Sequence, residues 1–241
     1  MSEVAASPDI TLAQPAYNEQ DNITNDLDQS AAAMEQLGRT WEILVIDNHS
    51  SDRTPQVVAE YARREPRVRL IVHDENRLYS GSCATALREA KGKYLAIMDS
   101  DGQFTAADLP KFLEKLQGGA NFVNGWRRER HDPFLRLVMS SVFNLLGKLW
   151  LGFPLHDLNC GIRMFDRKFM AAAAIKHRIN MANPEFYVRA KLAGLVLDEV
   201  PIQHAERKAG VTSHDLGKMW RIFVTVNRYF RDLGRELKGK S

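Results

Sequence analysis

The stretch Tyr94-Leu95-Ala96-Ile97-Met98 is apolar throughout and runs directly into Asp99-Ser100-Asp101-Gly102-Gln103. An unbroken apolar run of this length is typical of a strand that is buried on both faces of a parallel sheet. The run Ile43-Leu44-Val45-Ile46 has the same character, and it too is followed by a carboxylate, Asp47. Both runs predict inner strands with polar residues at their carboxyl ends.

On either side of these runs, short apolar stretches alternate with longer amphipathic ones. We predict strands at 9–14, 41–47, 67–73 and 93–99, with helices between them at 21–37, 54–64 and 80–90. This alternation predicts an α/β fold, with a doubly wound, mostly parallel sheet, helices on both faces and right-handed crossovers.

The pattern loosens after Gln117. Here we predict strands at 121–124, 161–165 and 195–202, and helices at 134–151, 184–193 and 218–240. The last helix has apolar residues at helical spacing, and its polar positions are mostly Lys and Arg. We therefore divide the chain into a flexible tail at 1–8, one α/β domain at 9–215 and a basic amphipathic helix at 216–241.

Composition excludes several classes of protein. The net charge of +3 is too small to argue for nucleic-acid binding, and two cysteines are too few for a disulfide framework. The start of the chain lacks the pattern of a signal peptide. Arg136 and Lys148 interrupt the apolar region 134–154, and the stretch between them falls short of the ~20 apolar residues that span a bilayer. We expect a cytoplasmic protein that is soluble or peripherally associated with a membrane, without a nucleic-acid partner.

Three polar clusters follow the ends of predicted strands. They are Pro15-Ala16-Tyr17-Asn18-Glu19, Asp47-Asn48-His49-Ser50-Ser51-Asp52 and Asp99-Ser100-Asp101. Ligands of doubly wound sheets bind outside the carboxyl ends of the strands. Acidic side chains gathered there repel one another unless a cation or hydrogen-bond donors balance them. The alternative, a set of solvated loops, is common for one such cluster and less so for three.

Asp99 and Asp101 are one residue apart at a strand end, where a turn at Gly102 can direct both carboxylates to one cation. The amide oxygen of Gln103 is a further candidate ligand. Mg²⁺ and Mn²⁺ prefer such oxygen ligands and share their coordination shell with phosphate. The run therefore predicts a Mg²⁺ or Mn²⁺ site beside a phosphate-containing ligand.

From about residue 9 to residue 215 the chain resembles the family-2 glycosyltransferases, and within them the dolichol-phosphate mannose synthase branch. The resemblance rests on the three clusters above and on later segments that occur in the family's order. These segments are Gly125-Trp126-Arg127, Asp157-Leu158-Asn159-Cys160-Gly161-Ile162-Arg163, Glu199-Val200-Pro201-Ile202, and His204 to Arg207 with Gly210.

The resemblance implies a GT-A fold in which a nucleotide-sugar lies over the strand ends. It implies donor contacts from all three clusters, namely from Pro15, Ala16, Tyr17, Glu19, Asp47, Asn48, Asp99 and Ser100. It also implies that Asp99, Asp101 and Gln103 hold the metal at the diphosphate, where a cation stabilises the leaving group. The alternative for Asp47 is a turn-capping role.

On the acceptor side, the resemblance matches Arg127, Arg136 and Arg207 with residues that contact donor or acceptor phosphates, and it assigns Arg136 and Arg207 to the acceptor phosphate. The planar fork of arginine suits phosphate oxygens. Asp101, Arg127, Arg207 and Glu185 form the candidate catalytic set. For Glu185 two roles stay open, because it could orient the acceptor or only favour the N-terminus of its helix.

The chain departs from the family pattern at three positions. Asn48 stands where members often have a second Asp, and His49 stands where they often have Gly. Leu78 replaces a glycine that is often found two residues after the Asn at position 76. These departures predict local differences in the base contacts and in the approach of the backbone to the donor.

A lipid-linked acceptor has to be reached from a membrane surface. The segments 134–151 and 218–240 are candidates for lying in the membrane interface, because each combines apolar residues with Lys or Arg. Packing on the domain's own core is the alternative for each. We favour membrane contact for the second segment.

We therefore hypothesise an inverting glycosyltransferase that moves a hexose of the mannose or glucose type to a polyprenyl or dolichyl phosphate. The donor would be GDP-mannose or a UDP-hexose. The first alternative is the same donor chemistry on a soluble or glycan acceptor, and the second is a non-catalytic nucleotide-sugar-binding protein. A nucleotidyltransferase is disfavoured, because the chain lacks a glycine-rich phosphate loop near its first strand.

Overall fold

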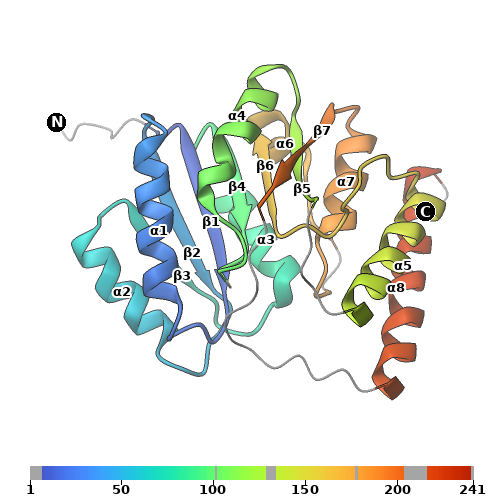
Figure 1. Cartoon of the computed structure of the whole chain (residues 1–241), viewed down its shortest axis with the longest axis horizontal. Coiled ribbons are helices and arrows are strands. Elements are labelled where there is room, and N and C mark those ends of the chain that lie inside the picture. Colours follow the sequence, from blue (N-terminus) through green and yellow to red (C-terminus); the bar gives the residue numbers. More distant parts are fainter. Residues whose placement is uncertain (1–6, 101, 129–133, 177–178, 204–215, 240–241) are drawn as a thin grey trace.

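The computed structural model describes residues 7–100, 102–128, 134–176, 179–203 and 216–239. Within these residues, seven strands form one sheet in the order β3-β2-β1-β4-β6-β5-β7 (Figure 1). The strands are β1 (Ile10–Ala16), β2 (Trp41–Asp47), β3 (Val68–Val72), β4 (Tyr94–Met98), β5 (Phe122–Arg127), β6 (Ile162–Asp166) and β7 (Leu197–Ile202).

Most neighbouring strands are parallel. β1 pairs in parallel with β2 and β4, β2 with β3, and β5 with β7, whereas β6 runs antiparallel to β4 and β5. The predicted mostly parallel sheet is confirmed, with one reversed strand that the sequence analysis does not predict. β5 runs past its predicted end at residue 124, because its pairing with β7 continues to Arg127 opposite Ile202.

Helices cover both faces of the sheet. They are α1 (Ile23–Gln36), α2 (Thr54–Arg64), α3 (Leu78–Glu89), α4 (Leu109–Gln117), α5 (Phe134–Leu151), α6 (Arg167–Ala172), α7 (Asn183–Leu192) and α8 (Leu216–Leu237), with a short 3-10 helix at Ala106–Asp108 before α4. α2 and α5 have the predicted bounds. The sequence also predicts a helix that opens at Thr105, and the 3-10 helix and α4 follow there, with Pro110 and the apolar spacing of Leu109, Phe112 and Leu116. α6 is absent from the prediction.

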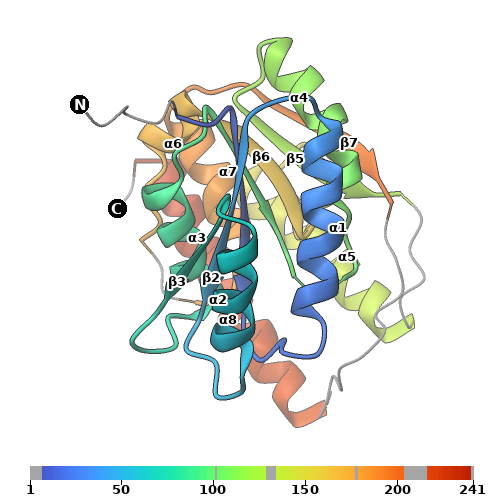
Figure 2. The ribbon, with the colours of Figure 1, turned by 90° about the vertical axis from the view of Figure 1, so that its left-hand side faces the viewer.

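The sheet separates two hydrophobic clusters. α1, α2 and α4 bury Leu27, Val58 and Phe112 on one face, and α3, α6 and α7 bury Cys83, Phe169 and Phe186 on the other. Figure 2, turned by 90° from Figure 1, shows α1 and α3 on opposite sides of the strands. The doubly covered sheet is the reason for the apolar runs in β2 and β4, whose residues are buried on both faces.

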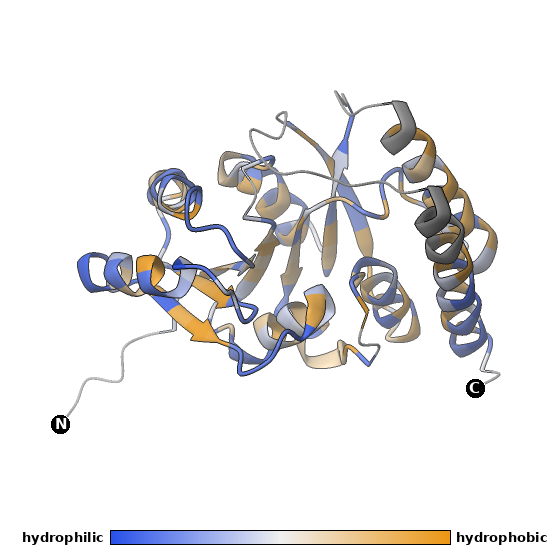
Figure 3. Ribbon diagram, turned by 90° about the horizontal axis from the view of Figure 1, so that it is seen from below, coloured by the Kyte–Doolittle hydropathy of each residue, from blue (hydrophilic) through white to orange (hydrophobic). Residues whose placement is uncertain are grey.

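α5 and α8 lie side by side at one end of the molecule, and α7 packs against α8 (Figures 1 and 3). A third cluster fills this contact with Leu146, Leu151, Phe153, Leu158, Tyr187, Val188, Val226, Tyr229, Phe230 and Leu233. Trp150 Nε1 also donates a hydrogen bond to Asn227 Oδ1 at 3.0 Å. The described apolar face of the C-terminal helix thus packs largely on the domain. None of the helices among the described residues is long and apolar enough to cross a membrane.

Candidate active site

The loops after β1, β2 and β4 meet at one edge of the sheet. Asn18 N donates to Ser50 Oγ at 2.9 Å, and Ser51 N donates to Asn18 Oδ1 at 2.8 Å. Ser100 Oγ, in the loop after β4, donates to Pro15 O at 2.7 Å. The three clusters that the sequence places at equivalent strand ends therefore do lie together.

Asp47 ends β2 and is fully buried. Its Oδ2 accepts a hydrogen bond from Ser50 N at 3.0 Å, which is the turn-capping role. Its Oδ1 is also buried and has no hydrogen-bond partner among the described residues. Leaving such an acceptor unsatisfied costs about 1–3 kcal/mol. The second oxygen is therefore suited to a ligand that donates to it, such as a nucleobase N–H or a ribose hydroxyl.

The other predicted donor contacts lie along the same edge and differ in exposure. Ala16 and Ser100 are buried, and Pro15 is partly buried. Glu19 Oε2 accepts from Asn22 Nδ2 at 3.1 Å at the start of α1. Tyr17 is 50% exposed and offers the largest open surface of this group to a ligand.

The side-chain amide of Asn48 organises the loop between β3 and α3. Its Oδ1 accepts from Arg77 N at 2.9 Å and from His73 Nδ1 at 3.0 Å, and its Nδ2 donates to Asn76 Oδ1 at 3.0 Å. The other ring nitrogen of His73 accepts from Thr85 Oγ1 at 2.9 Å. Burial, together with the nearby Arg77 cation, lowers the pKa of His73 below its usual value. The polar side-chain atoms of Asn48 are thus engaged in hydrogen bonds with other residues of the protein.

Two of the three departures from the family pattern fall on left-handed backbone. His49 has φ 64° and Leu78 has φ 59°, and both stand where relatives of the resembled family often have glycine. A side chain in this conformation costs roughly 1–2 kcal/mol. The chain therefore keeps the backbone conformation without the residue that favours it.

A cavity of about 230 Å³ opens between the loop after β4, the end of β5 and the starts of α3 and α7. It brings together three residues that the sequence predicts, Asp99, Gln103 and Arg127. Six further residues line it that are not predicted as site residues: Tyr79, Phe104, Asn159, Gly161, Asn180 and Asn183. Burial, and the neighbouring Asp99 carboxylate, raise the pKa of Tyr79 well above its usual value, whereas the Arg163 cation opposes this.

Gly161 makes room for the Asp99 carboxylate. A Cβ at this position would collide with the ring of Phe104 and with Asp99 Oδ2. Asp99 N also donates to Gly161 O at 3.1 Å, across β4 and β6. Asp101, the other carboxylate of the predicted metal site, lies outside the described residues. Among those described, no three His, Cys, Asp or Glu side chains form a metal-binding cluster.

Arg127 is held firmly at one side of the cavity. Its Nε and Nη2 donate to the carboxylate of Asp157 at 2.7 and 3.0 Å, and Nη2 also donates to Asn159 O at 3.1 Å. Both side chains of the ion pair are nearly buried. Arg127 therefore brings positive charge to the cavity and also fixes the turn before β6.

Arg163 lies fully buried beneath the cavity. Its guanidinium donates to Asn183 Oδ1 and to Cys160 O, and Asn183 Nδ2 donates in turn to Asn159 Oδ1 at 2.8 Å. Burial would lower the pKa of Arg163, but nearby acidic groups, including Asp99, raise it. The cation is thus an internal counter-charge below the cavity.

Glu185 does not line this cavity. It is fully buried at the start of α7, where Oε1 accepts from Arg189 Nη2 and from Lys176 N, both at 2.7 Å. Arg189 Nη1 also donates a hydrogen bond to Glu236 Oε2 of α8 at 2.6 Å. These contacts link the start of α7 to Lys176 and to Arg189. Arg207 lies outside the described residues, and of Arg136 the structure describes the backbone alone.

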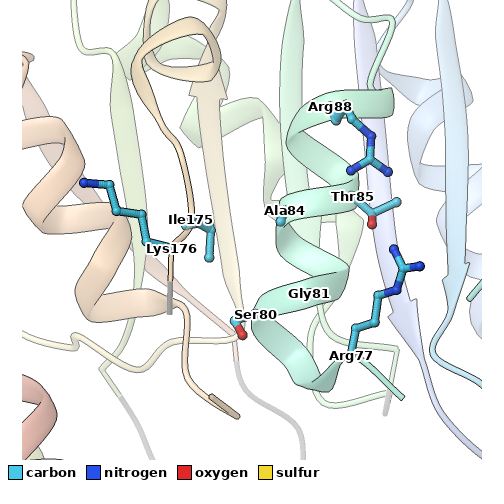
Figure 4. Close-up of a pocket in the computed structure, with 8 residues that line it drawn as sticks. All are labelled: Arg77, Ser80, Gly81, Ala84, Thr85, Arg88, Ile175 and Lys176. Carbon is cyan, nitrogen blue, oxygen red and sulfur yellow. The ribbon is translucent and has the colours of Figure 1, made fainter. Parts of the chain in front are cut away.

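A second hollow of about 200 Å³ lies along the outer side of α3. Figure 4 shows the side chains of Arg77, just before α3, and Arg88, in its last turn, pointing toward each other, with Ile175 and Lys176 on the facing segment. Arg77 and Arg88 are paired with Asp74 and Glu89, respectively. The contact of Ser80 with Ile179, Oγ to N at 3.1 Å, ties α3 to the facing segment. The two arginines of this hollow therefore form ion pairs with neighbouring carboxylates.

A mostly parallel, doubly covered sheet with an oxygen-rich cavity at the carboxyl ends of its strands defines a glycosyltransferase of the GT-A class. Residues 12–172, more than half of the chain, match the model of glycosyl transferase family 2. The chain belongs to this family, and the resemblance found in its sequence is confirmed.

Two curated relatives cover most of this chain. It is 28% identical over 228 residues to undecaprenyl-phosphate 4-deoxy-4-formamido-L-arabinose transferase of Edwardsiella ictaluri (strain 93-146), with 94% of this chain and 69% of the relative covered. It is 27% identical over 228 residues to dodecaprenyl-phosphate galacturonate synthase of Rhizobium johnstonii, with 91% and 66% covered. The chain thus spans about two thirds of the length of these relatives.

Solved structures share the fold. Glucosyl-3-phosphoglycerate synthase from Mycobacterium tuberculosis superposes with a TM-score of 0.70 at 15% identity, over 98% of this chain and 82% of that one. A mannosyltransferase from Pyrobaculum calidifontis, solved with GDP-Man and Mn²⁺, gives 0.60 at 18% identity, over 97% and 74%. At these identities the likeness establishes the GT-A architecture.

Proposed function

We propose that this protein is an inverting glycosyltransferase that moves a sugar from a nucleotide diphosphate donor to a polyprenyl phosphate. The observation that carries the proposal is the cavity in which Asp99 and Gln103 share one space with Arg127. The curated relatives support the acceptor, because undecaprenyl phosphate and dodecaprenyl phosphate are part of their names.

The donor would lie along the sheet edge from β2 to β4. The unpaired Oδ1 of Asp47 would accept a hydrogen bond from the base or the ribose, and the side chain of Tyr17 would cover the bound nucleoside. Asp99 and Gln103 fit a divalent cation, because both bring side-chain oxygen atoms to the cavity. Asp101 would be the further ligand. When bound, Mg²⁺ or Mn²⁺ neutralises charge on the departing diphosphate.

The acceptor phosphate needs no separate base. A phosphate monoester has its second pKa at about 6 and is largely ionised at neutral pH. One of its oxygens forms a bond to the anomeric carbon while the bond from that carbon to the diphosphate breaks, which inverts the configuration. Asp99 is the one carboxylate among the described residues that line the cavity. A hydroxyl acceptor would require a second group as base, whereas a phosphate acceptor would not.

Arg127, with Arg136 and Arg207, would hold the phosphates of donor and acceptor. Arg127 keeps its position through Asp157, so its charge is fixed before any ligand binds. A preorganised donor of this kind is worth more than one that has to be ordered during the reaction.

Access to the lipid would be provided by α5. Val138, Val142, Leu145 and Leu149 are exposed and follow one another at spacings of four, three and four residues, which places them on one face of the helix. Leu149 is 70% exposed, and Lys148 beside it is exposed too. Such a stripe with a neighbouring cation suits the interface of an anionic membrane. Peripheral attachment at the cytoplasmic face is part of this proposal.

The sugar and base are to be identified by a thermal-shift panel with and without Mn²⁺. We propose a hexose of the mannose or glucose type, and the panel includes GDP-mannose, UDP-glucose, UDP-glucuronate, UDP-galacturonate and a UDP-pentose. A ligand that binds only the folded state raises the melting temperature. A shift for one nucleotide-sugar that depends on Mn²⁺ would support the donor site. Equal melting temperatures with every nucleotide-sugar would count against it.

A further inference from the structure

Tyr79 is a cavity residue for which the proposed chemistry has no use. It lies in the first turn of α3 and lines the same cavity as Asp99 and Gln103. Its hydroxyl oxygen is buried, and the side chain packs partly against the cluster under α3, α6 and α7. The ring is therefore a wall between the cavity and the core.

The backbone around Tyr79 is fixed from several sides. Tyr79 N donates to Asn180 Oδ1 at 3.2 Å, and Ser80 N donates to Ile179 O at 3.4 Å. The preceding residue, Leu78, has left-handed backbone at φ 59°. Gly81 permits this tight start of the helix, since a Cβ there would collide with Cβ of Arg77. These contacts fix the backbone from which the ring of Tyr79 projects.

The position of Tyr79 relative to the donor follows from the proposed function. If Asp99 and Gln103 hold the cation at the diphosphate, the attached sugar enters the rest of the cavity, beside Tyr79, Asn159 and Asn180. Asn159 Oδ1 accepts from Asn183, and Asn180 Oδ1 accepts from Tyr79 N. Neither amide nitrogen donates to another residue in the described part of the chain, so each can donate to a sugar hydroxyl.

The size of the cavity makes a rigid wall effective. Its volume of about 230 Å³ is below the ~300–1,000 Å³ usual for small-molecule pockets. A space this small holds a sugar with few additional atoms. A side chain that blocks a larger ligand discriminates by exclusion, which is more effective when the blocking group is held in place.

We propose that Tyr79 determines donor specificity by closing the sugar subsite against sugars with bulky substituents. This inference rests on the proposed function and adds a selecting residue to it. The aromatic ring carries the effect.

The test compares kcat/KM for a compact and a bulky donor that share the base found in the thermal-shift panel, such as UDP-glucose and UDP-N-acetylglucosamine. Tyr79→Ala should raise the ratio of bulky to compact turnover by about tenfold or more, because single-group differences in a pocket are worth roughly 10–200-fold. Tyr79→Phe keeps the ring and should leave the ratio unchanged. Tyr61→Phe is the matched control, because Tyr61 bonds Asp28 on the other face of the sheet.

Because both donors are assayed with the same protein sample, the ratio of their kcat/KM values is independent of the fraction of protein that is folded. If Tyr79→Ala does not fold, Tyr79→Leu serves in its place, with folding checked by thermal denaturation. An unchanged ratio in an active Ala or Leu variant overturns the inference and leaves the proposed function standing. A change in Tyr79→Phe as large as in Tyr79→Ala also overturns it, since the hydroxyl would then be the cause. Absence of transfer by the wild-type protein from any donor overturns the proposed function, and the inference with it.

Discussion

The guanidinium of Arg127 donates two hydrogen bonds to the carboxylate of Asp157, at 2.7 and 3.0 Å, in a nearly buried ion pair. The pair joins the end of β5 to the turn before β6. Arg127 also reaches Asn159 O at 3.1 Å, so the same contact shapes the wall of the cavity. A residue that the sequence assigns to phosphate binding thus has a structural role as well.

Asp157→Ala should destabilise the protein by about 3–5 kcal/mol, because it leaves a buried cation without its partner. The exposed pair of Arg88 and Glu89 is the matched control, and Glu89→Ala should cost about 0–1 kcal/mol. Urea denaturation of both variants measures the difference. Equal costs would show that burial does not strengthen the Arg127–Asp157 pair.

At Leu78, glycine should be more stable than alanine by about 1 kcal/mol. The reason is the left-handed backbone of this residue, which a Cβ disfavours. Ala84 lies in the regular part of α3, where the opposite result is expected: Ala84→Gly should lower the free energy of unfolding by about 0.5–1 kcal/mol. Thermal unfolding of Leu78→Gly, Leu78→Ala and Ala84→Gly tests the sign. If Leu78→Ala proved the more stable of the two variants at 78, the residue would not be left-handed in solution.

The pH dependence of stability should change in Asn48→Asp. The pKa of His73 is lowered mainly by burial, so the unfolded chain binds the proton more readily than the folded one. Stability of the wild type therefore falls as the pH drops below about 6.5, the usual pKa of histidine. A carboxylate at position 48 faces His73 Nδ1, raises its pKa and should remove or reverse this loss.

Melting temperatures between pH 5.5 and 7.5 measure this slope. The double variant Asn48→Asp with His73→Gln is the control, and in it the added carboxylate should no longer alter the slope in this way. A slope that Asn48→Asp leaves unchanged would contradict the contact between the two side chains.

Replacing Leu145 and Leu149 by Gln should weaken binding to anionic vesicles that contain polyprenyl phosphate by about tenfold or more, because burying each leucine side chain is worth about 1.5–3 kcal/mol. Both residues are exposed on α5, so folding should be unaffected. Leu192→Gln is the matched control, since Leu192 is 51% exposed on α7. Co-sedimentation measures the difference, and equal binding of both variants would argue against α5 as the membrane surface.

The sequence predicts the inner part of the fold well, because burial leaves a direct mark on it. The apolar runs of β2 and β4 predict strands covered on both faces, and these strands are found with such burial. The reversed direction of β6 is not predictable in the same way. It depends on the pairing of β6 with β4 and β5, which local periodicity does not contain.

The residues of the site were likewise predictable where they belong to a local motif, and not where tertiary packing brings them to the cavity. Asp99, Gln103 and Arg127 belong to short motifs, and the structure places them around one cavity. Tyr79, Asn180 and Asn183 carry no such motif, and only the packing of α3 beside the start of α7 brings them to it. The departures at His49 and Leu78 were visible in the sequence, but their common cause, a left-handed backbone, required the structure.

The most direct test of the account is transfer of labelled sugar to undecaprenyl phosphate, with undecaprenol as the comparison, in the presence of Mn²⁺ or EDTA. The account predicts label in the lipid extract with the phosphate and Mn²⁺ only, and loss of that label in Asp99→Asn. Equal transfer to undecaprenol, or transfer that persists in both EDTA and Asp99→Asn, would contradict it.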